Sequence, residues 1–332
     1  LIRPEVGVNV FLAYKDMLTF VDVTHPGARR FLWSKIEQNY HDLGVRVFWL
    51  DESEPEIDPL DYQNVRYYLG NGMEVSNLYP YHLAQTAYEG QTQSGQTEVI
   101  NHIRSAWIGS QRFGVALWSG DIYGNFDTLR RQVKAGLNLS LCGIPWWSSD
   151  IGGFFYDEET PGQFHELLVR WFQFGAFSPI MRLHGKRPPF TEIEGCLVGT
   201  GAPNEVWSFG EEPYRIMRHY LDVRERLRPY ILKQMARASK DGTPVMRPLF
   251  FDFPDDEVSY TIEDQYMVGP DLLVAPVLEY GAASRSVYLP PGATWTDALA
   301  GETYTGGQTI AVAISLDHIP VFCKDGCEFS LV

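Results

Sequence analysis

The chain has 332 residues, of which 45% are hydrophobic and 14% aromatic, and its formal net charge is −15. A chain of this length can bury a sizeable core, and we expect one large domain with a smaller appendage. The negative charge argues against binding to nucleic acid or to an anionic membrane, because both require a basic surface. A neutral small molecule is the expected partner, and an excess of aromatic rings is typical of sites that bind sugars.

Cysteine usage and hydropathy exclude further classes of protein. Cys142, Cys196, Cys323 and Cys327 are too few and too irregularly spaced for a disulfide framework or a zinc site, so we expect ordinary thiols. The sequence contains no apolar run of about 18 residues and no signal peptide, which predicts no membrane partner. Localisation and oligomeric state are not predicted.

Short apolar runs alternate with amphipathic segments up to residue 185, the pattern of repeated strand and helix units around a parallel sheet. The first predicted helix has Pro26 near its start and Gly44 at its end. The predicted strands are 19–24, 45–51, 99–105, 114–121, 143–150 and 178–185. The predicted helices are 25–44, 80–92, 125–141 and 163–175.

The spacing of apolar residues changes after these units. Residues 213–239 carry apolar side chains at the spacing of a long amphipathic helix. From about Pro244, short apolar runs separated by Gly and Pro turns predict an all-β sandwich. We therefore predict a partial α/β barrel with a C-terminal helix over 1–243 and a β-sandwich domain over 244–332.

Polar residues close several of the predicted strands. Asp51, Asp121, Asp150 and His184 each end a strand, and Arg104 lies just inside the end of another. In a barrel of alternating strands and helices, the C-terminal strand ends open onto the face that holds the active site. These side chains are therefore candidates for one site, although aspartates after strands are also common as loop and helix-cap residues.

Asp51 and Asp121 are the best pair for acid–base chemistry. Two carboxyl groups at one barrel mouth can cleave a glycosidic bond with retention, one attacking the anomeric carbon and the other protonating the leaving oxygen. Asp51 ends an apolar strand and is the candidate nucleophile. Asp121 follows Trp118, and an apolar neighbour favours the neutral form that a general acid needs.

The residues around this pair allow two interpretations each. Arg104 and His184 either donate to sugar hydroxyls or form a buried ion pair and a core histidine. Glu54 is expected to support the hydrogen bonds of the pocket, although Glu52, Glu54 and Glu56 also suit a solvated acidic loop. The rings that could stack on a sugar are Trp49, Trp118, Trp146 and Trp147, with Trp49 equally suited to a core position.

Long motifs in order along the chain resemble glycoside hydrolase family 31. They are "FWLDESEPE", "IRSAWIGSQRFGVALWSGDI", "GIPWWSSDIGGF", "MRLHG", "RLRPYI", "GTPVMRPLFFDFPDD" and "QYMVGPDLLVAPV". The resemblance covers nearly the whole chain and implies a (β/α)8 TIM barrel followed by a β domain. Members of this family retain configuration at an α-anomeric carbon, and they include α-glucosidases, α-xylosidases, a sulfoquinovosidase, transglycosylases and α-glucan lyases.

Carried over by position, the resemblance implies roles for single residues. The nucleophile falls on Asp51 and the acid/base on Asp121, while Arg104 and His184 match sugar-binding residues. Trp49, Trp118 and Asp150 match residues that line or brace the pocket of the terminal sugar. No cofactor and no metal are implied.

Family members carry an N-terminal β-sandwich and two barrel strands before the point that matches Leu1, so we expect this chain to be the C-terminal part of a longer enzyme. The expected function is a retaining, exo-acting hydrolase of terminal α-xylosides or α-glucosides. The stretch "DESEPE" is more similar to the α-xylosidase type. The alternatives are a transglycosylase or α-glucan lyase of the same architecture, or a non-catalytic carbohydrate-binding fragment.

Overall fold

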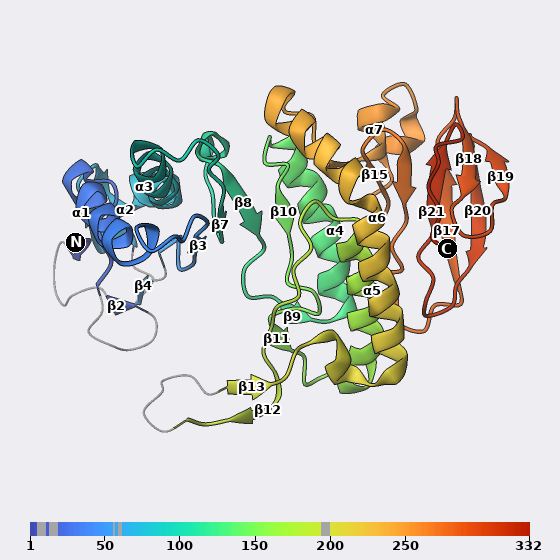
Figure 1. Ribbon diagram of the computed structural model, residues 1–332, viewed down its shortest axis with the longest axis horizontal. Coiled ribbons are helices and arrows are strands. Elements are labelled where there is room, and N and C mark those ends of the chain that lie inside the picture. Colours follow the sequence, from blue (N-terminus) through green and yellow to red (C-terminus); the bar gives the residue numbers. More distant parts are fainter. Residues whose placement is uncertain (5–10, 13–18, 56, 59–61, 194–199) are drawn as a thin grey trace. The chain divides into compact units, whose positions relative to one another are not determined.

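The computed structural model describes residues 1–4, 11–12, 19–55, 57–58, 62–193 and 200–332 (Figure 1). These residues form two compact units, Leu1–Trp118 and Ser119–Val332.

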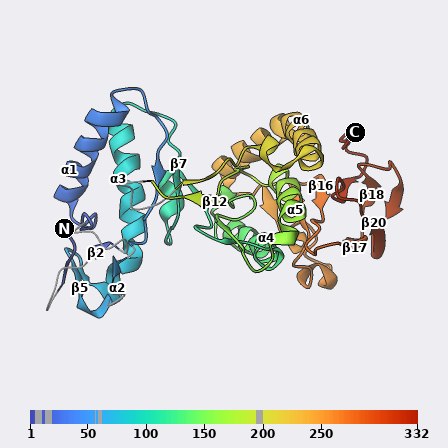
Figure 2. The ribbon, with the colours of Figure 1, turned by 90° about the horizontal axis from the view of Figure 1, so that it is seen from below.

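Two helices lie side by side in the first unit (Figure 2). Helix α1 spans Pro26–Ile36 and continues as a π-helical turn, Glu37–His41, while α3 spans Tyr79–Gln93. His25 caps α1 by accepting a hydrogen bond at Nδ1 from the Gly27 N–H, at 2.9 Å. The predicted helices 25–44 and 80–92 are confirmed.

Three parallel strands lead to the candidate site residues of this unit. They are β3 (Trp49–Leu50), β7 (Asn101–Ile103) and β8 (Val115–Trp118), shorter than the predicted strands that contain them. The remaining short strands and helices of the unit are β1 (Arg3–Pro4), β2 (Phe11–Leu12), β4 (Ile57–Asp58), β5 (Val65–Tyr67), β6 (Gly70–Asn71), α2 (Gly72–Val75), η2 (Tyr62–Asn64), η3 (Ser76–Leu78) and η4 (Ser110–Phe113).

The strand predicted at 19–24 is wrong, because this segment is irregular and ends in a turn before α1. The side chain of Asp22 explains the difference. Its Oδ1 accepts from the N–H and the hydroxyl of Thr24, at 3.1 and 2.6 Å, and its Oδ2 accepts from the Tyr68 N–H at 2.7 Å. A side chain that bonds the backbone two residues on stabilises a turn in place of a strand.

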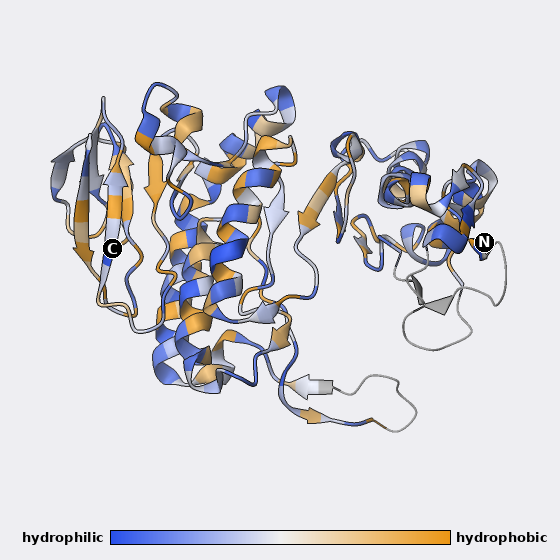
Figure 3. Ribbon diagram, turned by 180° about the vertical axis from the view of Figure 1, so that it is seen from behind, coloured by the Kyte–Doolittle hydropathy of each residue, from blue (hydrophilic) through white to orange (hydrophobic). Residues whose placement is uncertain are grey.

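Three long helices build the second unit: α4 (Phe126–Leu141), α5 (Phe164–Ala176) and α6 (Glu211–Asp241). All three confirm predicted helices, and their ribbons alternate hydrophilic and hydrophobic residues as amphipathic helices do (Figure 3). The connecting elements are β9 (Tyr123–Gly124), β10 (Trp147–Ser148), β11 (Phe155–Tyr156), η5 (Pro161–Gln163), β12 (Arg187–Thr191), β13 (Thr200–Ala202) and η6 (Val206–Phe209). Of the strand predicted at 178–185, the structure has a single parallel bridge, between Leu183 and Ile151.

The C-terminal part of this unit consists of two sheets. Strands β14, β15, β16, β21, β18 and β19 lie in that order in one sheet, and β17 pairs with β20 in the other. The strands of the first sheet are β14 (Met246–Arg247), β15 (Tyr266–Val268), β16 (Leu272–Val274), β21 (Val321–Lys324), β18 (Thr294–Asp297) and β19 (Thr303–Thr305). Those of the second are β17 (Ser284–Leu289) and β20 (Gln308–Ala313). Two short helices, α7 (Leu249–Asp252) and η7 (Glu257–Tyr260), lie between strands. Leu273 and Phe322 face the β17–β20 pair, whereas Leu272 and Val274 face the helices. The prediction of a sandwich agrees with this arrangement, and its boundary at 243/244 stays a prediction.

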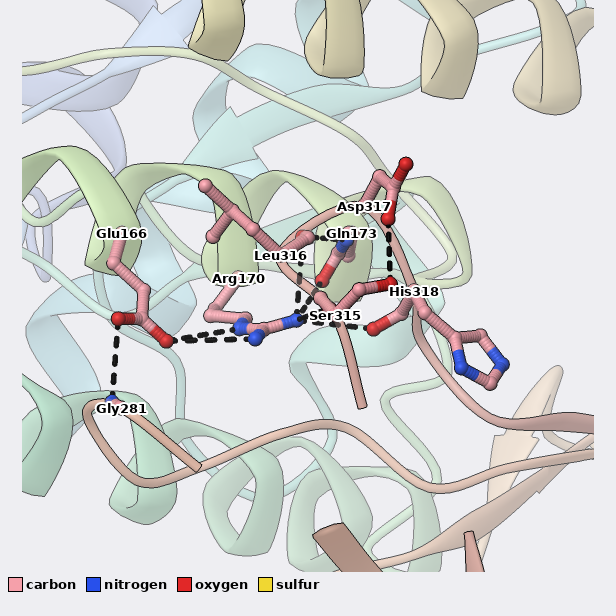
Figure 4. A network of polar contacts seen from close by, with 8 residues as sticks. All are labelled: Glu166, Arg170, Gln173, Gly281, Ser315, Leu316, Asp317 and His318. Carbon is pink, nitrogen blue, oxygen red and sulfur yellow. Dashed lines mark hydrogen bonds and ion pairs between the residues drawn. The ribbon is translucent and has the colours of Figure 1, made fainter. Parts of the chain in front are cut away.

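Arg170 of α5 joins the helices to the C-terminal sheets (Figure 4). Its buried guanidinium donates through Nη1 to the carbonyl oxygens of Ser315 and His318, both at 3.0 Å. Glu166 Oε1 lies 3.4 Å from the Nε of the same arginine, and Glu166 Oε2 accepts from the Gly281 N–H at 3.2 Å. The Arg170–Glu166 pair thus connects α5 with two loops that lie more than a hundred residues further along the chain.

Candidate active site

The register of the parallel strands brings Asp51 beside Arg104. Leu50 of β3 pairs with Ile103 of β7, so the next residue of each chain segment leaves the sheet at the same edge. The Asn101 side chain fixes this register, since its Oδ1 accepts from the Phe48 N–H at 3.0 Å. The strand ends therefore bring a carboxylate and a guanidinium cation to one place, as the sequence predicts.

Arg104 lies among three carboxylates. Its Nη1 is 3.4 Å from Asp51 Oδ1, and its Nη2 is 3.4 Å from Glu52 Oε2 and 2.6 Å from Glu54 Oε1. The arginine side chain is 6% exposed, whereas that of Asp51 is 38% exposed. A buried guanidinium beneath partly exposed acids explains how so many like charges can follow β3, because each repulsion is offset by the shared cation.

The backbone after Asp51 adopts an uncommon conformation. Glu52 has φ +50°, in the left-handed region that residues with a Cβ rarely occupy. The Glu52 N–H donates to Asp51 Oδ1 at 2.9 Å, and Ser53 Oγ accepts from the Ser105 N–H at 3.1 Å. Strained backbone held by such contacts is concentrated at functional sites, which supports Asp51 as part of one.

Two tryptophans and a histidine lie beside this cluster. The Trp49 and Trp118 rings are 5.8 Å apart, and the His102 ring lies 4.6 Å from Trp118. Trp118 is buried, while Trp49 is 52% exposed and so offers a ring face to a ligand. The sequence analysis missed His102, although it stands two residues before Arg104 in a strand, where alternate residues share a face.

In the second unit, Asp150 is fully buried and forms an ion pair with Arg182. The Asp150 carbonyl accepts from the Gly153 N–H at 2.9 Å, which turns the chain directly after β10. A buried carboxylate needs such a partner, because an unpaired charge in the interior is costly. Arg182 was missed in the sequence, where "MRLHG" pointed only to His184.

His184 stacks on Phe154, with ring centroids 5.5 Å apart and planes at 28°. Buried Arg187 connects the loop after β10 with the segment that carries His184. It donates to the carbonyl oxygens of Gly153, Ile151 and His184, at 2.8, 3.2 and 3.4 Å. Desolvation lowers the pKa of Arg187 to about 10, which leaves it protonated at neutral pH. A fixed positive charge therefore organises the turn that carries His184.

Asp121 is exposed, in the loop just before β9. It belongs to the second unit together with Asp150 and His184, while Asp51, Glu54 and Arg104 belong to the first. A retaining mechanism expects the carboxyl groups of Asp51 and Asp121 to lie roughly 5 to 5.5 Å apart. That separation stays a prediction.

Other predicted features concern metals, membranes and thiols. Over the described ranges, no three His, Cys, Asp or Glu residues are grouped as a metal ion would require. Among the helices that the structure describes, none is both long and apolar enough to cross a bilayer. Cys142, Cys323 and Cys327 are free thiols, and Cys196 and Glu56 lie outside the described residues.

Comparison with known proteins identifies both parts of the chain. The family model described as "Glycosyl hydrolases family 31 TIM-barrel domain" matches residues 5–234, and "Glycosyl hydrolase family 31 C-terminal domain" matches residues 242–327. The predicted fold, a TIM barrel followed by a β domain, is confirmed. The predicted family is the one these models describe.

Several relatives are enzymes acting on α-xylosides by name. An α-xylosidase of Saccharolobus solfataricus is 37% identical over 98% of this chain and 42% of its own length. α-Xylosidase A of Aspergillus niger is 35% identical over 91% of this chain and 46% of its own. A crystal structure of an α-xylosidase from a soil metagenome, complexed with xylose, is 50% identical with a TM-score of 0.94, covering 98% of this chain and 49% of that one.

The chain thus spans less than half of the length of these relatives. Within that span, the likeness runs through every segment that carries a predicted site residue. On the match of both domains and on these identities, the chain belongs to glycoside hydrolase family 31.

Proposed function

We propose that the protein containing this chain hydrolyses terminal α-linked sugars with retention of configuration, and that α-xylosides are its preferred substrates. The observation that carries the proposal is the position of Asp51 at the end of β3, in contact with a buried arginine and followed by a strained residue. The names of the relatives support xylose as the terminal sugar.

In the first step, Asp51 attacks the anomeric carbon while Asp121 donates a proton to the departing oxygen. The C–O bond to the leaving group breaks, and a β-linked glycosyl-enzyme forms. The Arg104 cation stabilises the carboxylate anion that a nucleophile must present. Trp49, half exposed beside Trp118, suits one wall of the sugar pocket.

In the second step, Asp121 acts as a base, removing a proton from water that attacks the same carbon from the opposite side. The ester bond to Asp51 breaks and the sugar leaves with its original α configuration. His184 and Arg104 supply donors for ring hydroxyls, which hold the sugar in position for attack. Asp150, buried and paired with Arg182, supports the loop that carries these contacts.

Azide distinguishes the two roles. In Asp51→Ala, hydrolysis of an aryl α-xyloside is expected to fall roughly 10⁴-fold, and added azide should give a β-xylosyl azide by direct attack. In Asp121→Ala, azide should attack the glycosyl-enzyme and give an α-xylosyl azide. Product configuration by NMR is the measurement, in the full-length protein.

Asp127→Asn is the matched control, since this carboxylate is exposed on α4 and pairs only with arginines of the same helix among the contacts described. It should leave rates unchanged. If Asp51→Ala gave the α-azide and Asp121→Ala the β-azide, Asp121 would be the nucleophile and Asp51 the acid/base. Unchanged hydrolysis in Asp51→Ala would mean that Asp51 has no part in the mechanism. New linkages in place of free xylose would indicate a transglycosylase.

A further inference from the structure

Two exposed aromatic rings, one of them two residues after Asp121, have no part in the mechanism above. Tyr123 of β9 and Phe155 of β11 are directly paired in a parallel ladder, and their ring centroids are 5.4 Å apart with planes at 38°. Tyr123 is 59% exposed and Phe155 is 39% exposed. Large rings that are held side by side and left in contact with solvent offer a flat surface to a ligand.

The backbone under these rings is tightly packed. A Cβ on Gly124 would lie 2.3 Å from the Gly152 carbonyl oxygen, and one on Gly153 would lie 2.5 Å from the Gly124 nitrogen. Only glycine allows such an approach. Asn125 Nδ2 also donates to Asp157 Oδ2 at 2.8 Å, which closes the far end of the ladder. The two rings therefore stand on a rigid base, and binding a ligand would order little that is not already ordered.

The rings continue a row that ends at a predicted sugar-binding residue. Phe154 packs edge-to-face on Phe155 with centroids 4.8 Å apart, and it stacks on His184 at 5.5 Å. Exposure alternates along the segment before them, since Asp121 and Tyr123 are exposed while Gly120 and Gly124 are buried. Tyr123 is therefore exposed two residues along the chain from Asp121, the proposed proton donor to the leaving oxygen.

We propose that Tyr123 and Phe155 form the surface on which the leaving-group sugar stacks, so that they determine which α-linked substrates are accepted. The inference rests on the proposed function, since it assigns Asp121 to the leaving oxygen and His184 to the terminal sugar. The leaving group is bonded to the oxygen that Asp121 protonates, so it must lie on the side of Asp121 away from the terminal sugar. A neutral pyranose presents C–H groups that pack on a ring face, and the Tyr123 hydroxyl can bond to its polar edge.

The test compares two substrates with the same terminal sugar. One is a disaccharide of α-linked xylose and glucose, and the other is α-xylosyl fluoride, which has no leaving-group ring. In full-length Tyr123→Ala or Phe155→Ala, kcat/KM for the disaccharide should fall about 10-fold, with the fluoride unchanged within about 2-fold. Tyr123→Phe keeps the ring, so its kcat/KM for the disaccharide should fall much less than that of Tyr123→Ala.

Acceptor transfer provides a second measurement, because an acceptor must enter where the leaving group departed. With the fluoride as donor and glucose as acceptor, the ratio of transfer to hydrolysis should fall in Tyr123→Ala by about as much as disaccharide cleavage. Tyr260→Ala is the control, since this ring is also exposed and stacked, on Phe250 at 4.8 Å, but belongs to the C-terminal part of the chain.

Equal falls in kcat/KM for the disaccharide and for the fluoride would overturn the inference, because Tyr123 would then affect binding of the terminal sugar or the stability of the protein. Unchanged kinetics in both alanine variants would overturn it as well. A wild-type protein that cleaves neither substrate would overturn the proposed function and, with it, the inference. A wild type active on both substrates, with variants selective against the disaccharide, supports both.

Discussion

At the scale of single residues, one arginine organises the acidic loop after β3. Arg104 is almost fully buried and contacts the carboxylates of Asp51, Glu52 and Glu54. The acids are partly exposed, so each pair is weaker than a fully buried one. Their common partner nevertheless makes the three positions interdependent, because losing the cation leaves three like charges together.

We expect Arg104→Met to lower both the stability and the activity of the protein. The free energy of unfolding should fall by about 2 kcal/mol, less than for a fully buried pair because the acids can recruit water. Turnover of an aryl α-xyloside should fall far more than stability requires, since Asp51 loses both its charge partner and its orientation. Urea unfolding and steady-state kinetics provide the two measurements.

Arg170→Met is the matched control for this prediction. It also removes a buried arginine paired with a glutamate, but its partners lie on α5 and in C-terminal loops, which carry no predicted catalytic residue. It should lose stability and keep its turnover at temperatures where it is folded. If the two variants lose activity in parallel, Arg104 acts through stability alone.

The candidate site residues could be chosen from the sequence because a strand end has a positional meaning. Asp51, Arg104 and Asp150 follow strands whose apolar pattern is plain, and a barrel opens its site at those ends. His102 and Arg182 were missed because each lies within a strand-like segment as the partner of another side chain. Spacing along the chain predicts which side chains gather, whereas their pairing depends on register and packing.

At the scale of secondary structure, glycines inside helices set how closely helices and strands approach. A Cβ on Gly90 of α3 would lie 1.9 Å from the ring of Trp33 in α1, and one on Gly136 of α4 would lie 2.4 Å from Trp147 Nε1. A glycine within a helix costs about 1 kcal/mol relative to alanine. These two helices accept that cost where a large ring lies directly against the backbone.

Gly136→Ala therefore tests packing against helix propensity. Propensity alone predicts a gain of about 1 kcal/mol, but overpacking against a fully buried ring costs about 1 to 3 kcal/mol. Trp147 is 1% exposed and has nowhere to move, so we expect a net loss and a lower Tm. Thermal unfolding followed by circular dichroism is the measurement.

Gly162→Ala is the control for this substitution, since no heavy atom lies within 4 Å of the added methyl group. It should be neutral or slightly stabilising. A stabilised Gly136→Ala would mean that Trp147 can move aside, in which case α4 is not held against β10 by this contact.

Helices were predicted well and strands poorly, for a physical reason. Helices α3 to α6 are long enough for the spacing of their apolar residues to be unambiguous. Strand β3 covers two residues of the predicted 45–51, because the extent of a strand depends on the strands that pair with it, which an apolar run does not specify. The segment 19–24 has the composition of a strand, but the carboxylate of Asp22 bonds the turn that precedes α1.

At the scale of the whole second unit, the helices and the C-terminal sheets share one core. A single cluster of buried residues includes Trp171 of α5, Tyr220 of α6 and Val268, Leu272 and Val321 of the sheets. Arg170 adds polar contacts across the same junction. A boundary near Pro244 is therefore a boundary in sequence, across which apolar packing continues.

We expect residues 119–332 to unfold as one cooperative unit, because separating the sheets from the helices would expose this core to water. In native-state hydrogen exchange at increasing urea, amides of α5 (Phe164–Ala176) and of β21 (Val321–Lys324) should lose protection together. Arg170→Met should lower the free energy of opening of α5 and that of β21 by the same amount, about 3 kcal/mol. The reason is that three carbonyl groups and Glu166 lose their partner. If β21 opened at lower urea than α5, the C-terminal sheets would be an independent folding unit, and Arg170 would be a contact between domains.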